Sequence, residues 1–326
     1  MRGRLICAAL LGALCLAPTA DARSPGFTSC INLGNALDAP TEGEWGYVIR
    51  QGDIRMVAEA GFDAVRIPIR WSAHAKKSAP YTIDPVFLTR ADQVISRALE
   101  AGLTTIIDIH HDPAFRDGSQ AELDRIDGIW TQLAAHYRDA PPRLLFELVN
   151  EPPGAFPKGF MDRANARLVA TIRATNPTRT IIYGADRWNS FDALTRAVPP
   201  DDRNLIATYH YYDPFAFTAQ GMDDGNGGSY PTGLTWGSNA DLATLYRDFD
   251  RVAEWAARND QAVLLGEFGV NARVPIGQRT TWITAVRFAA EKRGFAWCNW
   301  AFHAEFDAVD ENGKWIAPIL DALLGP

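Results

Sequence analysis

Two glutamates follow apolar segments of the chain, where a surface carboxylate is rarely found. Glu151 ends the run Leu-Leu-Phe-Glu-Leu-Val-Asn-Glu, and Glu267 lies in Val-Leu-Leu-Gly-Glu-Phe-Gly. Two carboxyl groups about 5 Å apart can cleave a glycosidic bond with retention of configuration, one as acid/base and the other as nucleophile. We therefore expect Glu151 to be the acid/base of such a reaction and Glu267 its nucleophile.

Neighbouring polar residues would give the two glutamates different roles. We expect Arg66 to lie near Glu267, to keep that carboxylate ionised and to lower its pKa. Partial burial and the second carboxylate would keep Glu151 protonated. Asn150 can bind the sugar 2-hydroxyl, and Trp300 offers an apolar face on which a sugar ring can stack.

Tyr212 and two adjacent histidines are further candidates for the site. The Tyr212 hydroxyl would orient Glu267, and His110 would contact the sugar or orient a catalytic residue. His110 and His111 could instead bind zinc, but adjacent residues of a strand point to opposite faces. We therefore expect no metal in the reaction.

Three tryptophans fall in predicted loops: Trp45, Trp188 and Trp236. Each could be a platform for a sugar ring or a residue that packs its own loop. For Trp236 the sugar platform is the favoured interpretation.

Eight predicted strands, alternating with amphipathic helices, must position these residues. The strands are Cys30–Leu33, Ala64–Pro68, Thr104–His110, Leu144–Asn150, Thr180–Gly184, Leu205–His210, Val263–Glu267 and Phe295–Trp300. Three predicted helices stop at a glycine just before the next strand, at Gly61, Gly102 and Gly294. Apolar strands that alternate with helices imply a parallel sheet covered on its outer side. The pattern predicts an α/β protein with a single-domain (β/α)8 TIM barrel.

In that fold the active site lies at the C-terminal ends of the strands. Polar and aromatic residues should therefore lie at the predicted C-terminal ends of the strands, and they do. This observation does not depend on any motif. From the second strand to the eighth they are Arg66, His110, His111, Asn150, Glu151, His210, Tyr212, Glu267 and Trp300. We expect them to face one pocket.

Seven short sequence blocks are spread along the chain: Asn-Leu-Gly-Asn-Ala-Leu at 32–37, Glu-Gly-Glu-Trp-Gly at 42–46, Val-Arg-Ile-Pro at 65–68, Asp-Ile-His-His at 108–111, Asn-Glu-Pro at 150–152, His-Tyr-Tyr-Asp-Pro-Phe at 210–215 and Gly-Glu-Phe-Gly at 266–269. In this order and spacing they resemble glycoside hydrolase family 5, and the resemblance covers almost the whole length after residue 22. It implies eight active-site positions: Arg66, His110, Asn150, Glu151, His210, Tyr212, Glu267 and Trp300.

The resemblance also implies residues that line a substrate cleft. His111, Asn35 and Asp38 match such positions in bacterial endo-β-1,4-glucanases, where Asp38 replaces a more usual Glu. Relatives often carry Glu where this chain has Ala301, and His where it has Ala219. Both changes remove polar groups that could select a hydroxyl configuration, which argues against mannan as a substrate.

We therefore expect a retaining endo-β-1,4-glucanase that acts on a β-glucan polysaccharide or oligosaccharide without a cofactor. A β-mannanase, a xyloglucanase and a mixed-linkage β-glucanase are alternatives with the same chemistry. A carbohydrate-binding protein on an inactive barrel is an alternative of another class, but it would lack at least one of the two carboxylates, and both are present here. A metal-dependent barrel hydrolase is a third alternative, and its activity would be lost on chelation.

The N-terminus and the charge limit the possible partners. Residues 1–22 resemble a secretory signal peptide, with Arg2 and Arg4, an apolar stretch and Ala-Asp-Ala at its end. Its removal would change the formal charge from −7 to −8 and leave a catalytic domain at 23–326. An acidic chain without basic clusters argues against a nucleic-acid partner. We expect a secreted monomer without a membrane span.

Two cysteines remain after the predicted signal peptide. Cys30 and Cys298 lie in the first and last predicted strands, which would be neighbours in a closed barrel. A bridge between them is geometrically conceivable. Two buried free thiols are the favoured interpretation.

Overall fold

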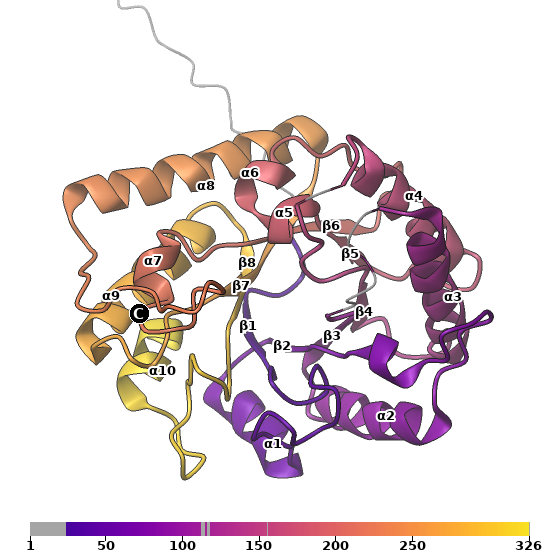
Figure 1. Ribbon diagram of the computed structural model, residues 1–326, viewed down its shortest axis with the longest axis horizontal. Helices are drawn as coiled ribbons and strands as arrows, with labels where there is room; N and C mark the ends of the chain where they lie inside the picture. Colours follow the sequence, from indigo (N-terminus) through magenta and orange to yellow (C-terminus); the bar gives the residue numbers. More distant parts are fainter. Residues whose placement is uncertain (1–23, 112–114, 116–117, 155, 326) are drawn as a thin grey trace, which may run out of the picture.

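Eight parallel strands form a closed barrel in chain order, as the sequence predicts (Figure 1). The computed structural model describes residues 24–325 apart from 112–114, 116–117 and 155, so the predicted signal peptide lies outside the described residues. The strands are β1 (Ser29–Asn32), β2 (Ala64–Ile67), β3 (Thr104–Asp108), β4 (Leu144–Glu147), β5 (Ile181–Tyr183), β6 (Leu205–His210), β7 (Ala262–Phe268) and β8 (Ala296–Asn299). The architecture is the (β/α)8 barrel.

Helices surround the barrel (Figure 1). They are α1 (Gln51–Ala60), the 3-10 helix η1 (Trp71–His74), α2 (Pro85–Glu100), α3 (Gln120–His136), α4 (Phe160–Arg173), α5 (Asp186–Asn189), α6 (Phe191–Leu194), α7 (Phe215–Thr218), α8 (Asn239–Asn259), α9 (Ile276–Glu291) and α10 (Ala317–Leu324). Among the helices of the described residues, none has both the length and the apolar character that a bilayer crossing requires.

Three helices end where the sequence predicts, just before glycines in a left-handed conformation. Gly61, Gly102 and Gly294 have φ angles of 99°, 86° and 71°. At the end of α1, the Gly61 N–H donates to the carbonyl of Ala58, which the helix would otherwise leave without a partner. Each glycine thus turns the chain from a helix into the following strand.

The strands bury both of their faces, which explains why they are apolar nearly throughout. Outward side chains such as Ile31, Val65 and Ile107 pack in the large core with the helices. Inward side chains form a smaller cluster inside the barrel: Cys30, Ala64, Ile106, Leu145, Ile182, Ile206, Leu264, Ala296 and Cys298. Two residues further along four of these strands, the inward positions are Asn32, Arg66, Asp108 and Glu147. The interior of the barrel therefore has an apolar layer and, nearer the C-terminal ends of the strands, a charged layer.

Several strands are shorter than predicted, and the early ends of β3 and β4 matter most for the site. β3 ends at Asp108 and β4 at Glu147, so His110, His111 and Glu151 follow the strands instead of ending them. His111 and Glu151 have φ angles of 49° and 44°, which a continuing strand does not allow. The chain thus turns sharply at the rim of the barrel, where chemistry is expected.

The prediction of two free thiols is wrong, because Cys30 and Cys298 form a disulfide. Closure of the barrel pairs β1 with β8 in a register that places Cys30 opposite Cys298, with their Cα atoms 4.2 Å apart. The register between the first and last strands is not readable from the sequence. The bridge joins residues 268 positions apart and covalently links the first and last strands of the barrel.

Removing this bridge should destabilise the protein without changing its site. A Cys30→Ala/Cys298→Ala variant should lose about 2–5 kcal/mol of unfolding free energy, because the unfolded chain gains freedom. Urea unfolding would measure the loss. Reduction of the parent protein is the matched control, since it breaks the bridge and leaves the side-chain volume in place. Equal stability of oxidised and reduced parent would contradict the prediction.

Candidate active site

Arg66 is the centre of a buried ionic network in the charged layer of the barrel. It comes from β2 and its side chain is fully buried. Its Nε donates to Oε2 of Glu147 at 2.7 Å and its Nη2 to Oε1 at 2.8 Å, a two-point contact with the carboxylate on β4. Nη2 also lies 2.8 Å from Oδ2 of Asp108 on β3. The guanidinium plane is therefore fixed from two neighbouring strands.

The remaining side of the same guanidinium faces the residues predicted for catalysis. Nη1 donates to Oε1 of Glu267 and to Oδ1 of Asn32, both at 2.8 Å. Nη2 donates to Oδ1 of Asn150 at 2.7 Å. The predicted contact between Arg66 and Glu267 is present, and Arg66 also orients the Asn150 amide.

Sequence reasoning missed Asp108 and Glu147, the two carboxylates that hold Arg66. Both are fully buried acidic residues inside apolar strands. The signal was available in the alternation of the strands, since side chains two positions apart share a face. Once Arg66 is placed inside the barrel, an ionic partner inside the barrel is required, because an unpaired buried charge is too costly.

Glu267 lies on β7 and is buried between two donors, Arg66 and Tyr212. The Tyr212 hydroxyl donates to Oε2 of Glu267 at 2.9 Å, as expected from the sequence. Burial raises the pKa of Glu267 to about 7, although His210, Arg66 and Tyr212 act to lower it. The predicted lowering of this pKa is therefore wrong. Loss of hydration outweighs a guanidinium that is shared among several carboxylates.

Glu151 follows β4 and presents its half-buried carboxylate to the same space. One carboxylate oxygen of Glu151 and one of Glu267 lie within 4.8 Å of each other. Burial raises the pKa of Glu151 to about 7, while Arg66 lowers it and Glu147 raises it. Protonation of one member of the pair near neutral pH relieves the repulsion between the two.

His210, at the end of β6, connects the two glutamates. Its Nδ1 is 2.7 Å from Oε1 of Glu151 and 3.6 Å from Oε2 of Glu267. Burial lowers the pKa of His210, so the ring is neutral. Because Nδ1 faces two carboxylates, we place the single ring proton on Nδ1, from which it is donated to Glu151.

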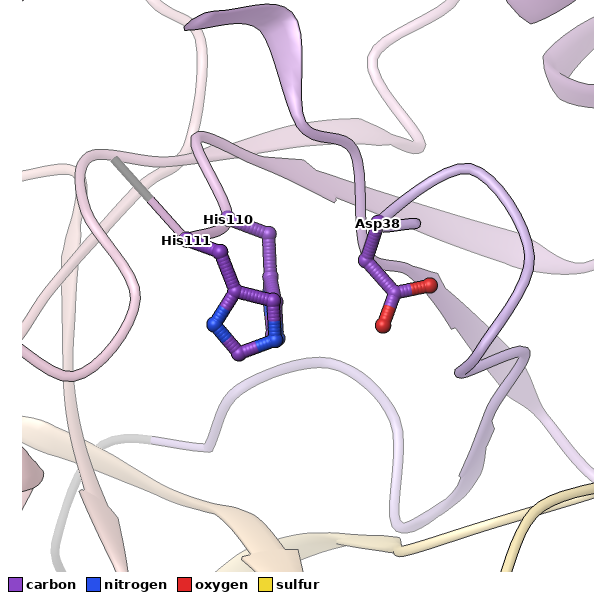
Figure 2. Close-up of side chains that lie close together, drawn as sticks. All are labelled: Asp38, His110 and His111. Atoms are coloured by element: carbon purple, nitrogen blue, oxygen red, sulfur yellow. The ribbon is translucent and has the colours of Figure 1, made fainter. Parts of the chain in front are cut away.

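Asp38, His110 and His111 form one side of the site, with all three side chains extending into a shared space (Figure 2). The two imidazole centroids are 4.3 Å apart with planes at 86°. The expectation that adjacent histidines point to opposite faces is wrong, because both lie beyond the end of β3 and His111 has the left-handed φ of 49°. Hydrogen bonds from the backbone N–H groups of Asn35 and Ala36, 3.1 and 2.7 Å long, hold the Asp38 carboxylate.

Trp300 lies face to face with His110, at 5.8 Å between centroids and 4° between planes. Its six-membered ring covers Gly34, where a Cβ would come within 2.6 Å of the indole. Gly34 is therefore required for the indole to lie flat beside the site. The peptide between Trp300 and Ala301 is cis.

An open cleft of about 560 Å³ leads to Glu151. Its lining residues are Trp45, Arg70, His111, Phe115, Val149, Asn150, Glu151, Pro152, Pro153 and Trp188. Trp45 and Trp188 are 40% and 60% exposed, as expected of platforms for an apolar ring face. Trp236 is only 7% exposed and belongs to the apolar core, so the prediction of a platform is wrong for this residue. Its backbone N–H donates to the Gln278 side chain on α9, a contact between distant segments that a local sequence pattern does not reveal.

Removal of Arg66 should leave several buried carboxylates without their cationic partner. An Arg66→Met variant should lose about 3–5 kcal/mol of unfolding free energy at neutral pH. The loss should become smaller as the pH falls, because protonation then neutralises those carboxylates. Urea unfolding at two pH values would measure it. Arg55→Met is the control, since the Arg55–Glu59 pair is 71% exposed on both sides and should contribute little. A pH-independent loss would contradict the prediction.

Comparison with known proteins agrees with this geometry. Residues 27–306 match the family described as Cellulase (glycosyl hydrolase family 5). The chain is 39% identical over 269 residues to Endoglucanase H of Acetivibrio thermocellus, and 32% identical over 287 residues to Cellulase/esterase CelE of the same organism. These alignments cover 82% and 81% of this chain but only 29% and 34% of the two relatives. The chain thus spans about a third of their length.

Solved structures are similar over nearly the whole chain. A hyperthermophilic endo-beta-1,4-glucanase in complex with substrate has a TM-score of 0.86 and 35% identity, with 92% of this chain and 97% of that chain covered. Thermotoga maritima Cel5A in complex with mannotriose has a TM-score of 0.86 and 37% identity, with 91% and 97% covered. The chain therefore belongs to glycosyl hydrolase family 5, the cellulase family.

Proposed function

We propose that this protein is a retaining endo-β-1,4-glucanase in which Glu267 is the nucleophile and Glu151 the acid/base. The observation that carries the proposal is the spacing of the two carboxylates, within 4.8 Å, beside an open cleft. This spacing fits direct attack by one carboxylate, whereas an inverting pair needs roughly 6.5–9.5 Å to admit a water molecule between carboxylate and sugar.

The groups around each glutamate are the basis on which we assign the roles of nucleophile and acid/base. Glu267 is fixed by donors from Arg66 and Tyr212, which stabilise its ionised form and aim an oxygen at the anomeric carbon. Glu151 lines the open cleft, where it can protonate the departing oxygen. In the first step the Glu267–carbon bond forms as the glycosidic bond breaks and Glu151 gives up its proton. In the second step Glu151 takes a proton from water, which displaces Glu267.

A neutral β-1,4-glucan is the substrate that the cleft and the comparisons favour. Trp45 and Trp188 offer exposed apolar faces for sugar rings. Ala219 and Ala301, where relatives often carry polar residues, are fully buried. Because the similar Cel5A structure was solved with mannotriose, mannan is the competing substrate to test. Initial rates of hydrolysis on cello-oligosaccharides, mannan and mixed-linkage glucan would identify the preferred substrate. A clearly higher rate on mannan would overturn the assignment of glucan as the substrate.

We also propose that residues 1–22 direct export and that the protein acts as a monomer of residues 23–326. The basic start, apolar stretch and small-residue end of that segment support export. N-terminal sequencing of the secreted protein and light scattering would test the two statements.

The two glutamates should respond differently to substitution. Glu267→Ala should abolish turnover, and added azide should replace the missing nucleophile and yield an α-glycosyl azide. Glu151→Ala should lower turnover on unactivated glucan by roughly 10²–10⁴-fold, and azide should yield a β-glycosyl azide. NMR identifies the anomers. Glu254→Gln is the control, because Glu254 is exposed on α8. Azide products of the opposite configurations would reverse the two roles.

The pH profile of kcat/KM should be bell-shaped with a maximum near neutrality. Activity should fall at low pH as Glu267 is protonated and at high pH as Glu151 loses its proton, since burial raises both pKa values to about 7. Tyr212→Phe removes a hydrogen bond that favours ionised Glu267. It should move the low-pH limb to higher pH and lower kcat roughly 10- to 100-fold. In the control Tyr211→Phe, the lost hydroxyl contacts Asp248 instead, so the limb should stay in place. Equal profiles for the two variants would refute the role of Tyr212.

A further inference from the structure

We propose that Asp38, His110 and His111 form a binding site for a first-row transition-metal dication such as Zn²⁺, and that the bound ion inhibits the enzyme by occupying the sugar-binding side of the site. Each residue offers one donor atom, and the three donors lie within 4.8 Å of one another. Two imidazoles and one carboxylate form a ligand set that suits zinc and its neighbours, in contrast to the oxygen sets preferred by calcium or magnesium.

Small side-chain movements suffice to bring the three donors onto one ion. Zinc binds nitrogen at about 2.0–2.1 Å, which places donors of a tetrahedral site about 3.4 Å apart. His111 is exposed at the rim and lines the open cleft, so its side chain is not enclosed on all sides. Its left-handed backbone already turns the ring toward His110 and Asp38 (Figure 2).

His110 has the surroundings of a metal-binding histidine. Its Nδ1 is 2.7 Å from Oδ2 of Asp108, a carboxylate that fixes the ring and leaves Nε2 as the lone-pair donor. The Asn150 amide reaches that Nε2 at 3.2 Å, a contact that an ion would replace. Asp38 is equally well fixed, because two backbone N–H groups bind its carboxylate. One of its carboxylate oxygens lies within 4.8 Å of a ring nitrogen of each histidine.

The charge of the surroundings favours a cation. Among the residues that the structure describes, five carboxylates line or underlie the site and two guanidinium groups oppose them: Asp38, Asp108, Glu147, Glu151 and Glu267 against Arg66 and Arg70. Arg66 is already engaged by three of these carboxylates. A dication at the histidines therefore enters a region with an excess of negative charge.

A second set of possible donors, Glu151, His210 and Glu267, is less suited to an ion. The ring nitrogen of His210 that faces the glutamates carries the proton donated to Glu151. Both oxygens of Glu267 already accept hydrogen bonds, from Arg66 and Tyr212. An ion there would lie beside the charged Arg66 guanidinium that binds Glu267, whereas at Asp38 and the histidines it replaces a neutral contact, the Asn150 amide on His110.

Calorimetric titration of the whole protein with zinc chloride tests the binding site without reference to activity. At about pH 7.5, where an imidazole of ordinary pKa is mostly neutral, we expect one ion per chain. His111→Asn should weaken binding by at least about 10-fold, because an amide is a poor zinc ligand. Asn tolerates the left-handed backbone at this position, so the loop should keep its shape. His136→Asn is the matched control, because it removes a half-exposed imidazole on α3, and its affinity should equal that of the parent.

Inhibition is tested separately and rests on the proposed glucanase activity. Zinc should raise KM for a soluble glucan and leave kcat unchanged, and a chelator should restore the original KM. No binding, or binding that His111→Asn leaves unchanged, would overturn the site whatever the activity. Binding that depends on His111 without any effect on KM would overturn the inhibition alone. If the protein binds zinc at His111 but cleaves no glucan, the metal site stands and the proposed function fails.

Discussion

The ionic network around Arg66 is the interaction on which the rest of the site depends. One fully buried guanidinium meets Asp108, Glu147 and Glu267, which come from three different strands. Transfer of these groups from water is costly, and only close pairing with hydrogen bonds offsets the cost. The network therefore makes the charged layer of the barrel possible. It also fixes Glu267 and Asn150 from below, so the rim residues are positioned by a rigid core and not by the loops that carry them.

Much of the fold could be predicted because its determinants are local and repeated. The alternation of short apolar strands with amphipathic helices predicts the barrel, and the glycines that end three helices indicate where the following strands begin. Strand polarity then placed the polar residues at one end of the barrel. That argument found Arg66, Glu151 and Glu267 without reference to any family, because in a parallel barrel all C-terminal strand ends meet at the same rim.

What could not be predicted depends on contacts between distant segments. The Cys30–Cys298 bridge requires the register between the first strand and the last, and the burial of Trp236 requires the path of a long loop. The orientation of His111 requires a single left-handed residue after a strand. The direction of the Glu267 pKa shift is not readable from the sequence either, because the sequence shows Arg66 but neither the loss of hydration nor the two further carboxylates that share the guanidinium.

The disulfide between β1 and β8 also changes the effect of proteolytic cleavage of the chain. A protease that cleaves any exposed loop between residues 30 and 298 would produce two fragments that stay tethered through sulfur. Each fragment would keep its own strands in the hydrogen-bonded ring, and neither could diffuse away. The two parts of a nicked molecule would thus stay joined, and the barrel would keep all of its strands.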